Sequence, residues 1–112
     1  MKGTVYELCE IKGKYSAVKV DNAEIHKRDG YAIYNAGVLH RYYKATDIAS
    51  GLLIDARPRK KDLISNLKSI IQEVKKAKEE NLPGYGQKGM TYTECVELLA
   101  KLVEKGNIDE DN

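Results

Sequence analysis

The chain has 112 residues, enough for one domain with a thin core, and we expect a single domain over residues 1–112. Charged residues make up 32 % of it but the formal net charge is only +2, which disfavours nucleic acid as a partner. The two cysteines, Cys9 and Cys95, have no zinc-type spacing, and no apolar run approaches the roughly 20 residues that span a bilayer. We therefore expect a cytoplasmic protein that needs no metal, no cofactor and no membrane.

The first half, residues 1–56, predicts short strands separated by polar turns. Apolar and polar residues alternate over 4–11 and 14–20, with the turn signal Lys12-Gly13 between them. Shorter strands follow at 23–26, 31–34, 38–45 and 52–54, divided by turns rich in Asp, Asn and Gly. Closely spaced turns are typical of an antiparallel meander, here of about six strands.

A helix is predicted over residues 60–80. Pro58 has no N–H for a central strand and marks the crossing from sheet to helix, and Pro83-Gly84 follows the helix end. The apolar residues follow one another in steps of three and four, which places them on one stripe: Leu63, Ile64, Leu67, Ile70, Ile71 and Val74. A lone helix cannot bury such a stripe, so the sheet must supply the opposing surface.

A second helix is predicted over residues 92–105. Thr91 is the expected N-cap, because Glu94 three residues later completes a capping box, and Gly106 is the expected residue after the helix end. Residues 106–112 are then an acidic, frayed tail. The predicted fold class is α+β: an N-terminal antiparallel meander of about six short strands with two C-terminal helices packed on it.

No catalytic pattern is apparent in the sequence. Neither His26 nor His40 has a carboxylate at metal-ligand spacing, and both cysteines alternate with apolar residues or lie on a helix stripe, as core residues do. We therefore expect a protein that is not an enzyme.

The junction between sheet and helix is basic. Arg57, Arg59, Lys60 and Lys61 cluster where a strand leads into a helix N-terminus, an arrangement that attracts phosphate but also fits an ordinary solvated turn. Arg28 would join this cluster if its turn lay at the same edge of the sheet.

The segment between the helices has the composition of a ligand-binding loop. Tyr85 and Tyr92 offer ring faces for a base, and Gln87, Lys88 and Thr91 offer polar contacts. The segment matches neither a Walker loop nor a dinucleotide fingerprint, and a flexible connection between helices is the alternative. Together with the basic junction it predicts a nucleotide pocket, which a dimer would complete.

On this layout and on the placement of Arg28, Arg57 and the loop, the chain resembles the small phage-encoded Thoeris anti-defence sponges of the first type. Those proteins bind and sequester cyclic ADP-ribose isomers without degrading them, and assemble as homodimers or, in some members, as hexamers that also hold cyclic oligonucleotides. The resemblance implies phosphate contacts from Arg28 and Arg57, and base contacts from Tyr85 or Tyr92. The chain differs from the family in having no Phe and no arginine after Arg59.

Two other classes of function stay open at this point. One is a phage or prophage protein-interaction module that inhibits a host defence protein through its eight tyrosines. The other is a small nucleic-acid-binding module that uses the basic junction and the tyrosine-rich sheet.

Overall fold

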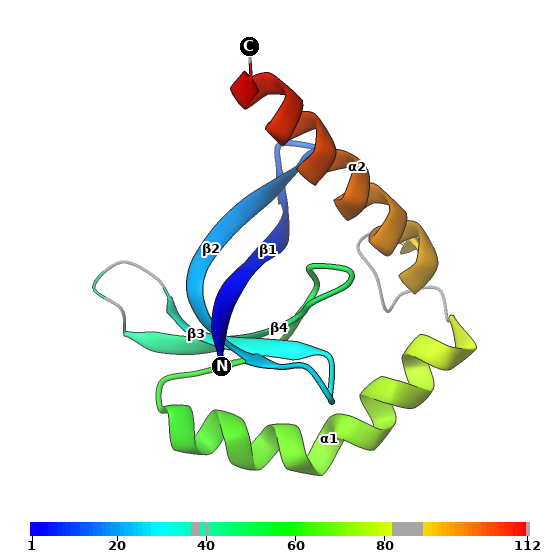
Figure 1. Ribbon diagram of the computed structural model, residues 1–112. Coiled ribbons are helices and arrows are strands. Elements are labelled where there is room, and N and C mark those ends of the chain that lie inside the picture. The colour runs from blue at the N-terminus through cyan, green and yellow to red at the C-terminus, as the bar shows by residue number, and fades with distance from the viewer. Residues whose placement is uncertain (37–38, 40, 82–88, 112) are drawn as a thin grey trace.

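A five-stranded antiparallel meander followed by two helices forms the α+β fold that the sequence predicts (Figure 1). The computed structural model describes residues 1–36, 39, 41–81 and 89–111. The strands are β1 Lys2–Ile11, β2 Lys14–His26, β3 Tyr31–Ala36, β4 Tyr42–Asp47 and β5 Leu53–Arg57, and the helices are α1 Lys60–Glu80 and α2 Tyr92–Asp111. The sheet order β1-β2-β3-β4-β5 follows the chain.

Strand β2 replaces two of the six predicted strands. The Asp21-Asn22 pair, predicted to be a turn, is a bulge within one continuous strand, where the pairing register with β1 shifts between Gly3 and Val5. Asn22 has a φ of 59°, in the left-handed region that Asn tolerates better than most residues. A bulge bends a strand and increases its twist without ending it, so the sheet has five strands.

The bulge also places both helices on one face of the sheet. On β1 and β2 this face carries Leu8 and its pairing partner Ala17; beyond the bulge it carries Glu24 and its partner Ile33. Helix α2 packs on Leu8 and helix α1 on Ile33. Without the extra residue the alternation of side chains would be reversed beyond the bulge, and the two helices would need opposite faces.

Helix α1 has the predicted bounds, and its stripe packs on β3 and β4. Leu63 and Leu67 are fully buried against Ile33 and Ala45. At the helix end Asn81 adopts a left-handed φ of 52°, and its N–H bonds to the carbonyl of Lys78. Helix α1 therefore covers the half of the sheet formed by the last strands (Figure 1).

Helix α2 packs on the β1–β2 hairpin and is longer than predicted. Its backbone stays helical through Gly106 to Asp111, so the frayed tail expected over 106–112 is wrong for the described part of that segment. Glycine in an exposed helix costs only about 1 kcal/mol, which the continuing backbone hydrogen bonds can offset. Gly106 accordingly does not have the positive φ of a helix-ending glycine.

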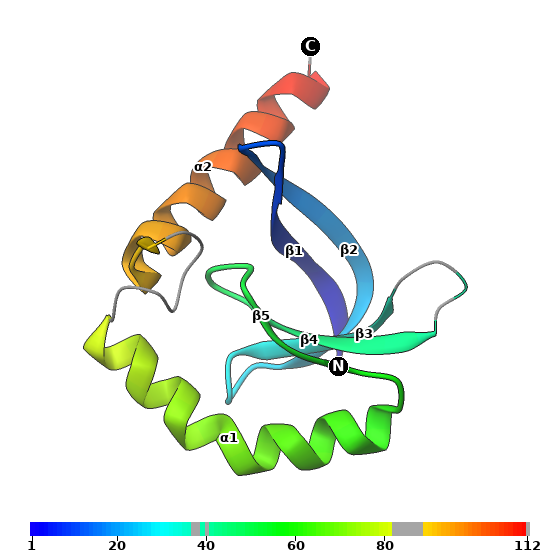
Figure 2. The same cartoon turned by 180° about the vertical axis from the view of Figure 1, so that it is seen from behind.

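The opposite face of the sheet, called here the helix-free face, closes on itself. The sheet curls so far that β1 meets the turn between β4 and β5, where the Leu8 N–H donates to the Gly51 carbonyl at 2.9 Å (Figure 2). Val5, Ala23 and Tyr34 form a small core inside the curl.

Candidate functional site

The predicted ligand residues lie at opposite ends of helix α1. Arg57 and Arg59 are exposed at its N-terminal end, whereas Thr91 and Tyr92 follow its C-terminal end. The 21 residues of α1 span about 30 Å at 1.5 Å per residue. Within one subunit these two groups of residues are therefore not brought together.

Arg28 and Arg57 lie at opposite ends of the strands of the sheet. Arg28 is exposed in the turn before Tyr31, which pairs with Asp47, whereas Arg57 pairs with Tyr43 at the other end of β4. Arg28 therefore does not join the basic junction at Arg57.

Thr91 and Tyr92 have structural partners. The Thr91 hydroxyl accepts the Glu94 N–H at 3.3 Å while the Thr91 N–H donates to the Glu94 carboxylate at 3.2 Å, which confirms the predicted capping box. The Tyr92 hydroxyl donates to Asp47 at 2.8 Å. Tyr85, Gln87 and Lys88, also predicted to bind ligand, lie outside the described residues, as does His40.

A pocket of about 400 Å³ opens where β2 separates from β3. Strand β2 pairs with β3 only through Glu24, Ile25 and His26, because the bulge at Asn22 turns the preceding part of β2 away. We call this gap the strand fork. It is lined by Lys2, Val20, Asp21, Asn22, Glu24, Ile33, Tyr34, Asn35, Tyr43 and Lys60. Its volume falls within the range typical of small-molecule sites.

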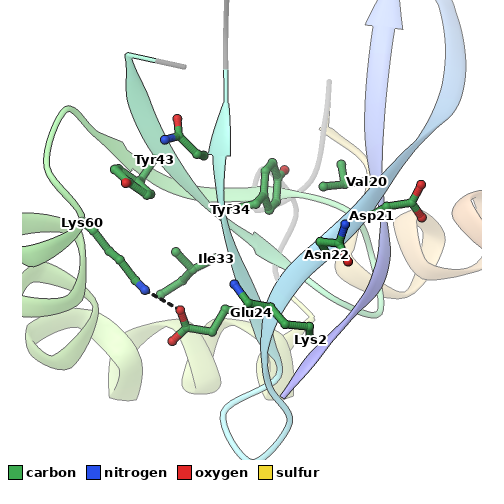
Figure 3. A pocket seen from close by; sticks show the side chains of 10 residues that line it. Lys2, Val20, Asp21, Asn22, Glu24, Ile33, Tyr34, Tyr43 and Lys60 are labelled. Carbon is green, nitrogen blue, oxygen red and sulfur yellow. Dashed lines mark ion pairs between the residues drawn. The ribbon is translucent and has the colours of Figure 1, made fainter. Parts of the chain in front are cut away.

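The strand fork combines ring faces, amides and charges (Figure 3). Tyr43 offers aromatic surface, Tyr34 lines the pocket but is only 9 % exposed, and the amides of Asn22 and Asn35 can each donate and accept hydrogen bonds. Because β2 and β3 are not paired here, backbone N–H and C=O groups of both strands also border the gap. Such a mixture suits a polar ligand that contains a ring system.

Lys60 connects the strand fork to the basic junction. It is the first residue of α1, and its ammonium lies 2.6 Å from the carboxylate of Glu24. The hydrogen bond from Lys60 lowers the pKa of Glu24, and it outweighs the opposing effect of burial. The N-cap residue Arg59 makes no side-chain capping hydrogen bond, and the first N–H groups of a helix attract anions, here beside Lys60.

Sequence reasoning identified Lys60 but missed the other residues of the strand fork. Lys2, Asn22, Asn35 and Tyr43 come from four different strands, and only the bulge brings them to one gap. The one local signal was the Asp21-Asn22 pair, which marks a break in β-pairing whether it forms a turn or a bulge.

A second polar cluster joins the two helices to the sheet. Asp47 is fully buried, accepts hydrogen bonds from the Ser50 hydroxyl and the Tyr92 hydroxyl, and forms an ion pair with Lys78. The Lys78 ammonium also lies 5.7 Å from the centre of the Tyr92 ring. Each group is held by another, as in a structural network that fixes the helix junction.

A third polar cluster lies within the curl of the helix-free face. The Tyr34 hydroxyl donates to Glu7 and contacts the Thr46 hydroxyl at 2.7 Å, and Lys44 lies 3.2 Å from Glu7. Burial, followed by the hydrogen bond to Glu7, strongly raises the pKa of Tyr34. Burial and the Glu7 charge also raise the pKa of Cys9, which disfavours the thiolate that a nucleophile would need.

Comparison with known proteins finds no match: no family model, no curated protein and no solved structure is similar to this chain. Among the described residues, no group of three or more His, Cys, Asp or Glu side chains is arranged to hold a metal ion. No helix in the described part of the chain is long and apolar enough to cross a membrane.

Proposed function

We propose that the chain binds a nucleotide-type ligand in the strand fork and acts by sequestering it rather than by turning it over. The observation that carries the proposal is the pocket itself, where two tyrosines and two amides meet Lys60 at the N-terminal end of a helix. A base can stack on a ring and bond to an amide, while a phosphate can bind the ammonium and the helix N–H groups. Sequestration needs only tight binding and enough protein.

Cyclic ADP-ribose isomers are the first ligands to test, because the chain resembles the Thoeris anti-defence sponges in layout. On this proposal the protein is phage-encoded, works in the cytoplasm of the host and removes a cyclic nucleotide signal of bacterial immunity. Cyclic oligonucleotides are the second class of ligand to test.

A homodimer or hexamer is the assembly expected on this proposal. Within one subunit, Arg57 and Arg59 are separated from Tyr92 by the length of α1, about 30 Å. Both groups can serve one ligand only if a second subunit supplies one of them. Native mass spectrometry of the purified protein mixed with a cyclic ADP-ribose isomer reports the assembly and the number of bound ligands together.

Two substitutions in one ion pair test the site with opposite expected effects. Lys60→Gln removes a charged donor worth about 1.5–3 kcal/mol, so affinity for the cyclic nucleotide should fall about 10- to 150-fold in titration calorimetry. Glu24→Gln frees the Lys60 ammonium from its carboxylate partner at 2.6 Å, so affinity should rise. Lys68→Gln, an exposed lysine further along α1, is the matched control and should change nothing.

The fate of the ligand separates a binder from an enzyme. Chromatography of the nucleotide after prolonged incubation and protein removal should return it intact. A cleaved product would contradict sequestration, and equal affinities for Lys60→Gln and Lys68→Gln would remove the strand fork from the proposal.

A further inference from the structure

The helix-free face carries an apolar groove beside the last strand of the sheet. The groove has a volume of about 400 Å³ and is lined by Tyr42, Lys44, Leu53, Ala56, Arg57 and Pro58. Leu53 is 55 % exposed and Tyr42 is 37 % exposed, although both are large apolar side chains. Exposed apolar surface in a groove is typical of an interaction site.

Basic residues outnumber acidic residues in and around the groove. Lys44 and Arg57 line it, and no carboxylate is among its lining residues. Lys44 forms an ion pair with Glu7 at 3.2 Å and Arg57 forms one with Asp55 at 2.9 Å, so these two charges are balanced, although each cation has more N–H donors than its partner uses. The exposed Arg41 and Arg59 adjoin it in sequence. The charge and the apolar floor together favour a partner that carries both carboxylates and apolar side chains.

The outer edge of β5 runs along this groove and is free in the described structure. Strand β5 is the last strand of the sheet and pairs only with β4. The other edge strand, β1, reaches the turn before β5 through the Leu8–Gly51 hydrogen bond, and no backbone bond of the described residues joins β1 to Leu53–Arg57. A free edge can accept an extended peptide through its backbone N–H and C=O groups.

We propose that β5 accepts an extended, acidic segment of a partner protein as a sixth strand. The apolar side chains of the bound segment would pack on Leu53 and Tyr42, and the carboxylates of the segment would bind Lys44 and Arg57. A single exposed tyrosine gives no run of stacking platforms, so the groove fits a peptide better than single-stranded nucleic acid. This interaction is additional to ligand binding in the strand fork, because the strand fork and the groove share no lining residue.

The test uses a labelled short peptide in which Asp or Glu alternates with Val or Leu, and a second peptide with Lys in place of every acidic residue. Fluorescence anisotropy should detect binding of the acidic peptide only, weakened by added salt. Hydrogen exchange of backbone amides in residues 53–57 should slow on binding, as expected for a new strand.

Variants inside and outside the groove test whether the peptide binds there. Leu53→Gln should weaken binding about tenfold or more through lost apolar burial, and Arg57→Gln should weaken it similarly while reducing the salt effect. Val18→Gln changes an apolar residue, 44 % exposed, that does not line the groove, and should leave affinity unchanged. Lys60→Gln should also leave it unchanged, which separates this proposal from ligand binding in the strand fork.

Three results would overturn the proposal. Equal binding of the acidic and basic peptides would show that charge does not select the partner. Unchanged hydrogen exchange of the β5 amides would show that the peptide does not add as a strand. Binding of an oligothymidine that Leu53→Gln weakens, with no binding of the acidic peptide, would assign the groove to nucleic acid.

Discussion

Asp47 is the residue on which the packing of both helices depends. It lies at the end of β4 and is fully buried, yet it is bound by Ser50 from the following turn, Lys78 from α1 and Tyr92 from α2. A buried carboxylate is tolerated only when it is paired and hydrogen-bonded. The cluster therefore links three elements through one charge, and a change in any partner affects the others.

Lys78→Met should destabilise the fold by about 3–5 kcal/mol, because it leaves the Asp47 charge buried without its cation. Chemical denaturation of the single variant and of the double variant Lys78→Met with Asp47→Asn measures this effect. The double variant removes both charges and should recover part of the loss. Equal losses in the two variants would show that the charge itself is not what destabilises the single variant.

At the scale of elements, the junction between the helices is built from local caps. Asn81 ends α1 in a left-handed conformation, and its side-chain oxygen accepts the Thr93 N–H at 2.8 Å, so one residue serves the end of α1 and the start of α2. Thr91 and Glu94 complete the start of α2. The Thr91–Glu94 cap depends on residues three apart, which is why the start of α2 at Tyr92 could be predicted from sequence, whereas Pro58 predicts the start of α1 at Lys60.

Thr91→Ala should lower the free energy of unfolding by about 1 kcal/mol, the usual cost of losing an N-cap hydroxyl. Thermal unfolding followed by circular dichroism is the measurement, with Thr93→Ala as a control at an exposed position of the same type. A larger loss in Thr93→Ala than in Thr91→Ala would contradict the assigned cap.

At the scale of the whole molecule, carboxyl groups with a lowered pKa limit stability at acid pH, and tyrosines with a raised pKa limit it at alkaline pH. The hydrogen bond from Lys60 lowers the pKa of Glu24; Asp55 also has a lowered pKa, because hydrogen bonds led by Arg57 outweigh its burial. Burial raises the pKa of Tyr34 and, less strongly, of Tyr31. The carboxylates stabilise the fold only when ionised, and the tyrosines only when neutral.

Stability should therefore be level near neutral pH and fall in two separate ranges. Below the ordinary pKa of 4.5 for Glu24 it should decrease as the pH falls through the lowered values, and above the ordinary pKa of 10.0 for Tyr34 it should decrease as the pH rises. Urea unfolding across the pH range measures both limbs. Tyr34→Phe should flatten the alkaline limb, and an unchanged limb in that variant would assign it to other groups.

Local patterns in the sequence were sufficient to predict the α+β class, the bounds of α1, the start of α2 and its capping box, because periodicity and caps act over a few residues. The sequence also identified the basic junction that contains Lys60. It could not show that Asp21-Asn22 bends one strand rather than separating two, since a turn and a bulge use the same residues. Only the tertiary structure decided that.

The same limit applies to the functional surfaces. The strand fork gathers residues from β1, β2, β3, β4 and α1, and the β5 groove depends on which strand edge stays unpaired. Gly51 shows how such long-range packing is set: an added Cβ there would lie 2.7 Å from the Leu8 nitrogen, so β1 can approach the turn only because this residue is glycine. A sequence fixes which residues can make such contacts, but which of them meet is decided by strand register and by the curl of the sheet, both of which depend on residues far apart in the chain.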